Sequence, residues 1–488
     1  MQELKKIERI SLIYPPYGAV LNEPGIKAVK ENYGVFPSLS LAYVGGVVES
    51  TGVKLQFIDA NALQLSVEEV VERVRKFEPD LVGYTITTYL FYQTLSWVKA
   101  IREATGVPTI LGGVHMGIYP DETFTHTEID YGVVGEAEET LPDFIETVNR
   151  SGNLADVKGL IWRDGDRVVV NELRDLFQDV DNSPLPARNH LPNDKYYSFI
   201  SQFKNFTPII TSRGCPFRCI FCEQGGMKFR PRSAKVVVDE IEECYHVYKV
   251  RELDFFDSSF TVQKQRVIDI CKELVNRRLP GIHWAIRSRV DLVDKEVLEA
   301  LRSAGCKRIY YGVESGNPEI LKTLRKKVEM ERISDVIRMT NKAGIDSFGY
   351  FMVGSPGETP ETVQQSIDFA ISLGLDYAQF SKVTPMPATE LYQMVLEQFK
   401  KDYWQEYILD ANKEAVIPRP GTEMTDDEIQ AWTRKAYLNF YFRPRYILKA
   451  LWRLKSFHEF KRSVYTAWSM FWERNRVFER SWMKKLQY

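Results

Sequence analysis

The sequence predicts an α/β protein with two parallel sheets and a helical carboxyl-terminal part. Its 488 residues are enough for about three domains. Short apolar runs alternate with amphipathic segments over residues 1–150 and again over 196–400, which is typical of βα units. Beyond residue 400 the pattern is helical, and six of the nine Trp lie there. These three observations define the fold class.

Within residues 1–150 we expect a doubly wound parallel sheet. The predicted strands are 10–14, 53–58, 81–85 and 109–111, and the predicted helices are 41–50, 67–77 and 95–104. Ligands of such sheets bind at the carboxyl ends of the strands. Residues 151–195 are predicted to be a linker that contains a hairpin turning at Asp164-Gly165, followed by a proline-rich stretch.

Residues 196–400 are predicted to form a partial (β/α)6 barrel. The expected strands are 207–211, 253–256, 282–286, 308–311, 347–352 and 377–380. Six strands fit a partial barrel better than a complete eight-fold one, and the chemistry of such barrels gathers at the carboxyl ends of the strands. Residues 401–488 are predicted to be a helical carboxyl-terminal domain.

The composition excludes several classes of protein. Lys and Arg total 64 against 66 Asp and Glu, and this balance argues against a dedicated nucleic-acid binder. Six Cys in so long a chain do not make a disulfide scaffold. The sequence begins without a signal-peptide pattern, and no apolar stretch reaches the roughly 18–20 residues that span a bilayer. We therefore expect a reducing, cytoplasmic setting.

A cysteine motif directly follows the first predicted barrel strand. Cys215, Cys219 and Cys222 have the spacing Cys-x3-Cys-x2-Cys. Three thiolates on one loop can ligate three irons of a cubane and leave the fourth iron open, as a catalytic cluster requires. A zinc site is the alternative, but zinc takes four Cys or His ligands. The nearest further ligands, Cys244 and His246, lie a predicted helix away.

This motif resembles the signature of the radical S-adenosylmethionine (SAM) superfamily, with Phe221 as its aromatic residue. The resemblance implies that a [4Fe–4S] cluster binds SAM and that one electron cleaves SAM to a 5′-deoxyadenosyl radical. It also implies SAM contacts at the ends of later strands. Asp257 or Ser258 would meet the amino group, Arg287 or Arg289 the carboxylate, Glu314 the ribose or amino group, and Gly354 the adenine. Surface ion pairs are the alternative for the charged residues.

Residues 8–150 resemble the Rossmann-like cobalamin-binding domains that are fused to radical SAM enzymes. Thr85 and Thr87 fall at a strand end, and Gly112-Gly113 follows 27 residues after Thr85. Paired glycines would let the backbone approach the nucleotide tail of cobalamin. Recurrent segments of these fusions match residues 14–18, 37–46 and 135–139, and the further contacts that the resemblance implies are Pro15, Tyr17, Tyr84 and Glu136.

One departure from these domains concerns the lower cobalt ligand. Many cobalamin proteins carry Asp-x-His-x-x-Gly, whose His ligates cobalt, but residues 59–64 read DANALQ, with Asn61 in place of that His. The resemblance implies that cobalamin binds without this His. We expect His115 to be a loop residue near the nucleotide tail rather than a ligand. The alternative for the domain is a sheet that kept only the fold or binds another nucleotide.

The carboxyl-terminal tail is basic and aromatic, with 14 Lys and Arg against three Glu over residues 434–488. Arg443-Pro444 resembles a feature of cobalamin-linked radical SAM proteins. We expect a helical cap whose aromatic residues pack on the barrel mouth. The alternatives are a membrane-surface contact for a lipid substrate and docking to an acidic protein partner.

Taken together, the resemblance and the domain order imply methylation of an unactivated carbon. One SAM would yield the radical, methylcobalamin would supply the methyl group, and a second SAM would restore it. A flavodoxin or ferredoxin type of electron donor is implied. The alternatives are a cobalamin-linked radical cyclase acting on a tetrapyrrole or similar substrate, and a cobalamin-responsive regulatory protein. The substrate classes that fit are small molecules, lipids and protein side chains.

Overall fold

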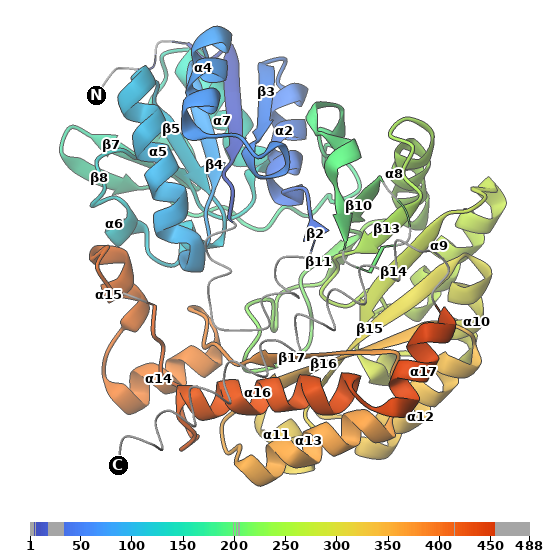
Figure 1. The fold of residues 1–488 in the computed structure, drawn as a ribbon. Helices are drawn as coiled ribbons and strands as arrows, with labels where there is room; N and C mark the ends of the chain where they lie inside the picture. Colours follow the sequence, from blue (N-terminus) through green and yellow to red (C-terminus); the bar gives the residue numbers. More distant parts are fainter. Residues whose placement is uncertain are drawn as a thin grey trace.

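The computed structural model describes residues 4, 6–17, 34–198, 200–201, 203, 205–413 and 415–453. Within them the chain forms one seven-stranded and one six-stranded sheet. Figure 1 shows the first sheet with its helices in blue and cyan, and the second sheet, from green to orange, beside it. The predicted α/β class with two separate sheets is confirmed.

The first sheet has the strand order β3-β1-β4-β5-β6-β7-β8. Its first five strands are parallel, and β7 and β8 join as antiparallel strands. The bounds in sheet order are Lys54–Asp59, Arg9–Tyr14, Leu81–Thr85, Thr109–Gly112, Tyr131–Val133, Leu160–Asp164 and Arg167–Val170. The chain changes direction across the sheet between β1 and β4, and ligands of doubly wound sheets bind at such a switch point.

Helices cover both faces of this sheet. α2 and α7 pack with one apolar cluster, and α4 and α5 pack with another. α4 occupies its predicted range because Ser66 and Glu69 form a capping box at its start. The helix bounds are α2 Leu39–Ser50, α3 Ala60–Leu63, α4 Val67–Phe77, α5 Phe91–Thr105, α6 Pro120–Thr123 and α7 Ala137–Asn149.

The hairpin that the sequence predicts between the two sheets belongs to the first sheet. β7 pairs with β6, and the β7–β8 turn lies at Gly165–Asp166, one residue later than predicted. The hairpin covers the edge of β6, whose backbone donors and acceptors would otherwise be unpaired. Residues 160–170 therefore extend the first sheet.

The second sheet consists of six parallel strands in chain order, as predicted for a partial barrel. Helices cover its outer face and bury one continuous apolar core. The strands are β10 Phe206–Ile209, β13 Glu252–Phe255, β14 His283–Ser288, β15 Cys306–Glu314, β16 Asp346–Val353 and β17 Tyr377–Lys382. The helices are α8 Ala234–His246, α9 Lys264–Arg277, α10 Lys295–Ser303, α11 Pro318–Thr323, α12 Met330–Lys342 and α13 Pro360–Ser372.

Two short strand pairs lie between the sheets. β11 (Ser212–Arg213) pairs with β12 (Arg230–Pro231), and β2 (Gly34–Val35) pairs with β9 (Tyr197–Ser198). The first pair closes the base of the loop that carries the three cysteines. The second joins the amino-terminal part of the chain to the segment that enters the barrel.

The carboxyl-terminal helices are α14 (Glu390–Phe399), α15 (Tyr403–Leu409), α16 (Asp426–Tyr441) and α17 (Pro444–Arg453). Trp404 and Ile408 of α15 pack into the core of the first domain, which ties the end of the barrel back to that domain. Figure 1 shows α16 alongside β17, and Phe440 packs with the core on the outer face of this strand. This corrects the expected cap over the barrel mouth, because the described aromatic residues of α16 cover the barrel's side.

Arg443 and Pro444 form the junction between α16 and α17, where Arg443 Nε donates to Phe440 O at 2.7 Å. The rest of the basic tail, after residue 453, lies outside the described residues. None of the helices that the structure describes is long and apolar enough to cross a membrane.

Candidate active site

The three motif cysteines lie on the loop between β11 and β12. Arg213 and Arg230 face each other in this strand pair and close the base of the loop. Gly214 has φ +76°, and a side chain there would overlap the Lys228 carbonyl, so only glycine fits. Phe221 packs beside a small apolar cluster that contains Ile220. The sequence therefore folds the thiols onto one closed, braced loop.

The electrostatic surroundings of the thiols suit a metal cluster. Burial raises the pKa of Cys215 and Cys222, while nearby cations oppose that shift. One of these cations, Arg289, places Nη1 3.7 Å from Cys219 Sγ. Thiolates are the ligands of iron–sulfur clusters, and positive charge nearby favours thiolates.

Three thiols on one loop fit a cubane that keeps an open iron. Among the described residues no three His, Cys, Asp or Glu side chains converge as ligands of a single metal ion. A cubane needs no such convergence, since each thiolate ligates a different iron.

Lys326 is the second cation near the thiols, and sequence reasoning missed it. Its side chain is 7% exposed, and Nζ lies 2.8 Å from Glu314 Oε1. Glu314 has φ +69° at a bulge near the end of β15, an unusual backbone conformation that often marks functional sites. The structure brings Glu314, Lys326 and the cysteine loop together at the mouth of the barrel. Residues 325–327 are three consecutive cations, and nothing in that run indicates that the middle one is buried.

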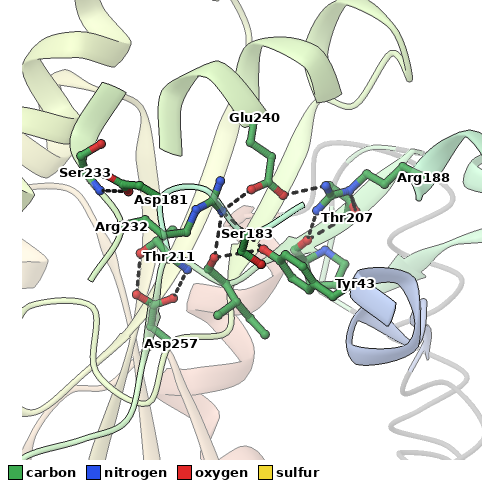
Figure 2. Close-up of polar contacts among 12 residues, drawn as sticks. Tyr43, Asp181, Ser183, Arg188, Thr207, Thr211, Arg232, Ser233, Glu240 and Asp257 are labelled. Carbon is green, nitrogen blue, oxygen red and sulfur yellow. Dashed lines mark hydrogen bonds and ion pairs between the residues drawn. The ribbon is translucent and has the colours of Figure 1, made fainter. Parts of the chain in front are cut away.

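Asp257 corrects one sequence expectation. It is 1% exposed, and its carboxylate accepts hydrogen bonds from Thr211 N at 2.6 Å and from Ser212 Oγ at 2.7 Å. Figure 2 shows Asp257 turned toward Thr211, directly before the cysteine loop. These donors hold Asp257 at the start of the loop, and because the residue is buried, its carboxylate is turned to the protein rather than to the place expected for the SAM amino group. The neighbouring Ser258 is exposed at the same strand end.

The two arginines proposed for the SAM carboxylate lie in different places. Arg287 points into the barrel, where Nη1 donates to Asp254 Oδ1 at 2.6 Å and to Phe255 O at 2.9 Å. Arg289 lies at the cysteine loop, with its guanidinium 4.1 Å from the Phe217 ring centre. Both arginines are paired, Arg287 with Asp254 and Arg289 with Asp291 through Nε–Oδ1 and Nη2–Oδ2, each at 3.0 Å. Arg289 is the better placed of the two for a group bound at the cluster because it lies beside the cysteine loop.

Gly354 also has a different role from the one expected. It has φ +93°, and a side chain there would meet Ile429 Cδ1 at 2.8 Å and Arg419 Cδ at 2.9 Å. The glycine therefore allows the segment after β17 to pack closely, while the expected adenine contact stays a prediction. Its N–H donates to Glu358 Oε2 at 2.6 Å. Glu358, which sequence reasoning missed, is buried, and burial raises its pKa to about 7.

The expected cobalamin contacts gather at the switch point of the first sheet. Pro15 and Tyr17 follow β1, and Thr85 ends the adjacent β4. Thr87 is exposed just beyond it. Tyr84 is 2% exposed, and its hydroxyl finds no hydrogen-bond partner in the part of the chain that the structure describes. A buried polar atom without a partner is unusual in a folded protein and fits a site that a ligand completes.

The two paired glycines have different surroundings. Among the residues that the structure describes, a side chain on Gly112 would meet no atom within 4 Å, so its surface there is open at the carboxyl end of β5. Gly113 has φ +110°, and a side chain there would lie 2.5 Å from Ile86 O. Gly112 therefore offers backbone surface to a ligand. Gly113 is required by the close approach to the segment after β4, not by the nucleotide tail.

His115 is a residue of the domain core. Its ring is fully buried, with Nδ1 3.0 Å from Thr88 Oγ1 and Nε2 2.8 Å from Thr123 Oγ1. Burial lowers its pKa to about 4, so the ring is neutral at physiological pH. Both nitrogens are engaged, which corrects the expectation that His115 lies near the nucleotide tail.

The segment that departs from the cobalt-ligand motif, residues 59–64, also makes its hydrogen bonds within the protein. Asp59 is fully buried, and its carboxylate accepts from Ala62 N at 2.8 Å and from the Tyr196 hydroxyl at 2.7 Å. Asn61 lies in the short helix α3 that Asp59 caps. Tyr196, from the connecting segment, thus donates the side-chain hydrogen bond that Asp59 accepts.

Glu136 corrects a further expectation. It follows the carboxyl end of β6, but its carboxylate bonds to Arg213 at 2.9 Å and to Arg230 at 2.7 Å, on the strands that flank the cysteine loop. It therefore joins the two domains, and the side-chain partners that the structure gives its carboxylate are these two arginines.

The same region shows how the two domains face each other. Beside Glu136, the Tyr43 hydroxyl of α2 donates to Ile210 O, just after β10, at 3.4 Å. The Phe36 ring, before α2, lies 6.1 Å from the Phe256 ring that follows β13. These contacts bring the carboxyl edges of the two sheets together, as expected if both cofactors serve one cavity.

Comparisons with known proteins agree with this architecture. Residues 209–370 match the radical SAM superfamily, and residues 27–145 match the B12 binding domain. An uncharacterized methyltransferase of Pyrococcus horikoshii is 32% identical over 93% of this chain and 96% of its own length.

Two further similarities concern a cyclase and a solved structure. An anaerobic magnesium-protoporphyrin IX monomethyl ester cyclase of Cereibacter sphaeroides is 29% identical over 86% of this chain and 71% of its own length. The solved structure of the cobalamin-dependent SAM radical enzyme OxsB, with aqua-cobalamin and SAM bound, has a TM-score of 0.66 at 18% identity. It covers 96% of this chain, which covers 72% of OxsB.

Proposed function

Because the chain belongs to the radical SAM superfamily and carries a B12-binding domain, we propose that it methylates an unactivated carbon of its substrate. Its cofactors are a [4Fe–4S] cluster, SAM and cobalamin. When bound, the cluster and SAM supply a radical that abstracts hydrogen, and the cobalamin supplies the methyl group. The protein's own residues bind and orient these groups and exclude water.

The observation that carries this proposal is the meeting of the two carboxyl edges. The contact of Glu136 with Arg213 and Arg230 holds the edge of the first sheet against the cysteine loop. Direct methyl transfer needs one substrate carbon within reach of both cofactors, because reacting groups must lie within a few ångströms of their target. The proposed contacts are the cysteine loop, Ser258, Arg289 and Glu314 on one side, and Pro15, Tyr17, Thr85, Thr87 and Gly112 on the other.

A cobalamin-linked radical cyclase is the second candidate, since the Cereibacter sphaeroides relative is named a cyclase. The relative from Pyrococcus horikoshii, which matches more of this chain, is named a methyltransferase and favours methylation. The two reactions differ in what they make from SAM, so product analysis separates them.

For each molecule of methylated product we expect one 5′-deoxyadenosine and one methionine from the first SAM, and one S-adenosylhomocysteine from the second. Two SAM and two electrons are consumed, because one SAM is cleaved reductively and the other donates its methyl group. Reduced holoenzyme would be incubated with methyl-deuterated SAM and cell extract, and mass spectrometry would count the products and the label. Formation of 5′-deoxyadenosine and of an unlabelled product without S-adenosylhomocysteine would favour the cyclase. The Cys219→Ala variant is the control for label transferred without radical chemistry.

Several further assignments belong to the same proposal. The electrons would come from a flavodoxin or ferredoxin type of donor in a reducing, cytoplasmic setting, which suits six cysteines that form no disulfide. The substrate would be a small molecule, a lipid or a protein side chain, and the basic tail would serve a membrane surface if the substrate is a lipid. The proposed domains are 1–150 for cobalamin, 151–195 as a linker whose hairpin at 160–170 extends the first sheet, 196–400 for radical SAM, and 401–488 as a helical end.

A further inference from the structure

One contact between the two domains is a cluster of carboxylates and guanidinium groups at the base of the cysteine loop. Glu136 and Glu138 come from the start of α7 in the first domain, and Arg213 and Arg230 come from β11 and β12. We call these four residues the interdomain clamp. None of them is a ligand of the cluster in the motif described above, and each belongs to a segment next to a proposed cofactor site.

The geometry of the clamp is specific. Arg230 makes a two-pronged contact with Glu136, with Nη1 to Oε2 at 2.7 Å and Nη2 to Oε1 at 2.9 Å. Arg213 donates to the same Glu136 Oε1 at 2.9 Å and also contacts Glu138. Paired, charge-assisted hydrogen bonds fix both distance and orientation, which a single ion pair does not. The clamp therefore sets how the loop sits against the first domain.

Burial makes the clamp sensitive to the loss of one partner. The side chains of Arg230 and Glu138 are 5% and 6% exposed. Burial alone would raise the pKa of Glu136, but hydrogen bonds from Arg230 and Arg213 outweigh it and hold that pKa below its usual value. Such a carboxylate contributes its stabilisation above its unfolded pKa and loses it only as the pH falls through the lower folded value. The Glu136 carboxylate is therefore ionised at neutral pH.

The connecting segment reinforces the clamp. Phe177 N donates to Glu136 Oε2 at 2.7 Å, and Ser183 Oγ donates to Glu138 Oε1 at 3.0 Å. Asp181 Oδ1 accepts from Ser233 N, just after β12, at 2.7 Å. Figure 2 shows Asp181 beside Ser233, and Ser183 near Arg232. The connecting segment thus packs along the base of the cysteine loop. The clamp carboxylates Glu136 and Glu138 hold it there.

Apart from Phe177 N and Ser183 of the connecting segment, the partners of the clamp carboxylates are the two arginines of the clamp. Glu136 is the N-cap residue of α7, but its side chain makes no capping hydrogen bond. Glu138 bonds only within the clamp and to Ser183 among the contacts that the structure describes. Replacing these carboxylates by amides should therefore leave α7 folded and change mainly the domain contact.

We propose that Glu136 and Glu138 are positioning residues, which hold the cysteine loop at a fixed place against the cobalamin-binding domain through Arg213 and Arg230. The inference deepens the proposed function, since methyl transfer between two cofactors needs a constant separation. Domains of one chain move relative to each other by default unless their contact is large and apolar, and here α15 holds only the far end of the barrel to the first domain. The clamp suppresses that motion at the point where the two strand edges meet.

The test compares the domain separation in the full chain with its cluster reconstituted. Spin labels would be attached through ketone-bearing unnatural residues at Glu72 of α4 and Lys295 of α10, which are exposed on different domains. Pulsed electron–electron dipolar spectroscopy would be recorded with the cluster oxidised and diamagnetic. The variant is Glu136→Gln/Glu138→Gln. The matched control is Glu242→Gln, which removes a carboxylate that pairs with Arg277 between the outer helices α8 and α9 of the barrel domain.

We expect a narrow distance distribution for the wild type and for Glu242→Gln, and a distribution at least about twofold wider for the double variant. Iron content and 5′-deoxyadenosine formation without substrate should stay near wild type, because the thiols remain. An unchanged width in the double variant, or equal widening in the control, would overturn the proposal. If the double variant does not fold, Glu136→Gln alone gives the same comparison. The result is independent of methyl transfer, so failure of the proposed function would not produce it.

Discussion

Replacement of Cys219 by Ala is expected to abolish both the iron–sulfur cluster and the cleavage of SAM. Wild-type protein reconstituted without oxygen should hold about four iron and four sulfide per chain. The variant leaves one iron of the cubane without its thiolate, and Arg289, 3.7 Å from Cys219 Sγ, without the charge that it faces. Iron and sulfide assays, together with chromatography of 5′-deoxyadenosine after reduction, measure both effects.

Cys271→Ala is the matched control for this prediction. Cys271 is 1% exposed in the barrel core, on α9. Removing its sulfur leaves a small cavity, with a cost on the order of 1 kcal/mol, and should not touch the cluster. A Cys219→Ala protein that still forms 5′-deoxyadenosine would contradict the assignment. So would a loss of iron from Cys271→Ala as large as that from Cys219→Ala.

Gly112→Val is expected to weaken cobalamin binding at least about tenfold, or about 1.4 kcal/mol. The side chain would occupy surface that is open in the described part of the structure, where no atom of a described residue lies within 4 Å, so the fold should tolerate it. Gly112→Ala should have a smaller effect because it fills less of this space. Titration with cobalamin, followed by absorbance, measures the affinity, and thermal unfolding checks the fold.

The controls for Gly112 separate blocking from misfolding. Gly113→Val should destabilise the domain, since φ is +110° and the backbone of Ile86 leaves no room. Gly152→Val, beyond the end of α7 and about 20 Å from its start, should bind cobalamin normally. Asn61→Ala should change affinity little, because its amide is not proposed as a cobalt ligand. Wild-type affinity in Gly112→Val would place the cofactor elsewhere.

The sequence predicted the two sheets well because their strands are short apolar runs with clear helical spacing between them. The predicted range of α4 was correct because a capping box marks its start. The sequence did not reveal that β7 and β8 join the first sheet, since a hairpin has the same local pattern whether or not it pairs with a third strand. The domain borders at residues 150 and 195 remain predictions.

Functional residues were predicted less well than the fold, for a physical reason. A motif places a polar residue at a strand end, where ligands bind, but its partners come from distant parts of the chain. Asp257 is bonded by Thr211 and Ser212, and Glu136 by Arg230, which is 94 residues away. Both carboxylates hold the cysteine loop in place. They therefore act on the cofactors through the loop and not by direct contact. The cysteine spacing itself was readable because the ligands share one loop.

The most direct test of the central claim is the distance between cobalt and the 5′-carbon of SAM in a structure of the protein with both cofactors bound. The two carboxyl edges meet at the contact between Glu136 and Arg213, so we expect both cofactors to border one cavity. One substrate carbon must be reachable from each, which limits the separation to roughly 10 Å or less. Cofactors that lie tens of ångströms apart, or that open onto different faces of the molecule, would contradict direct methyl transfer.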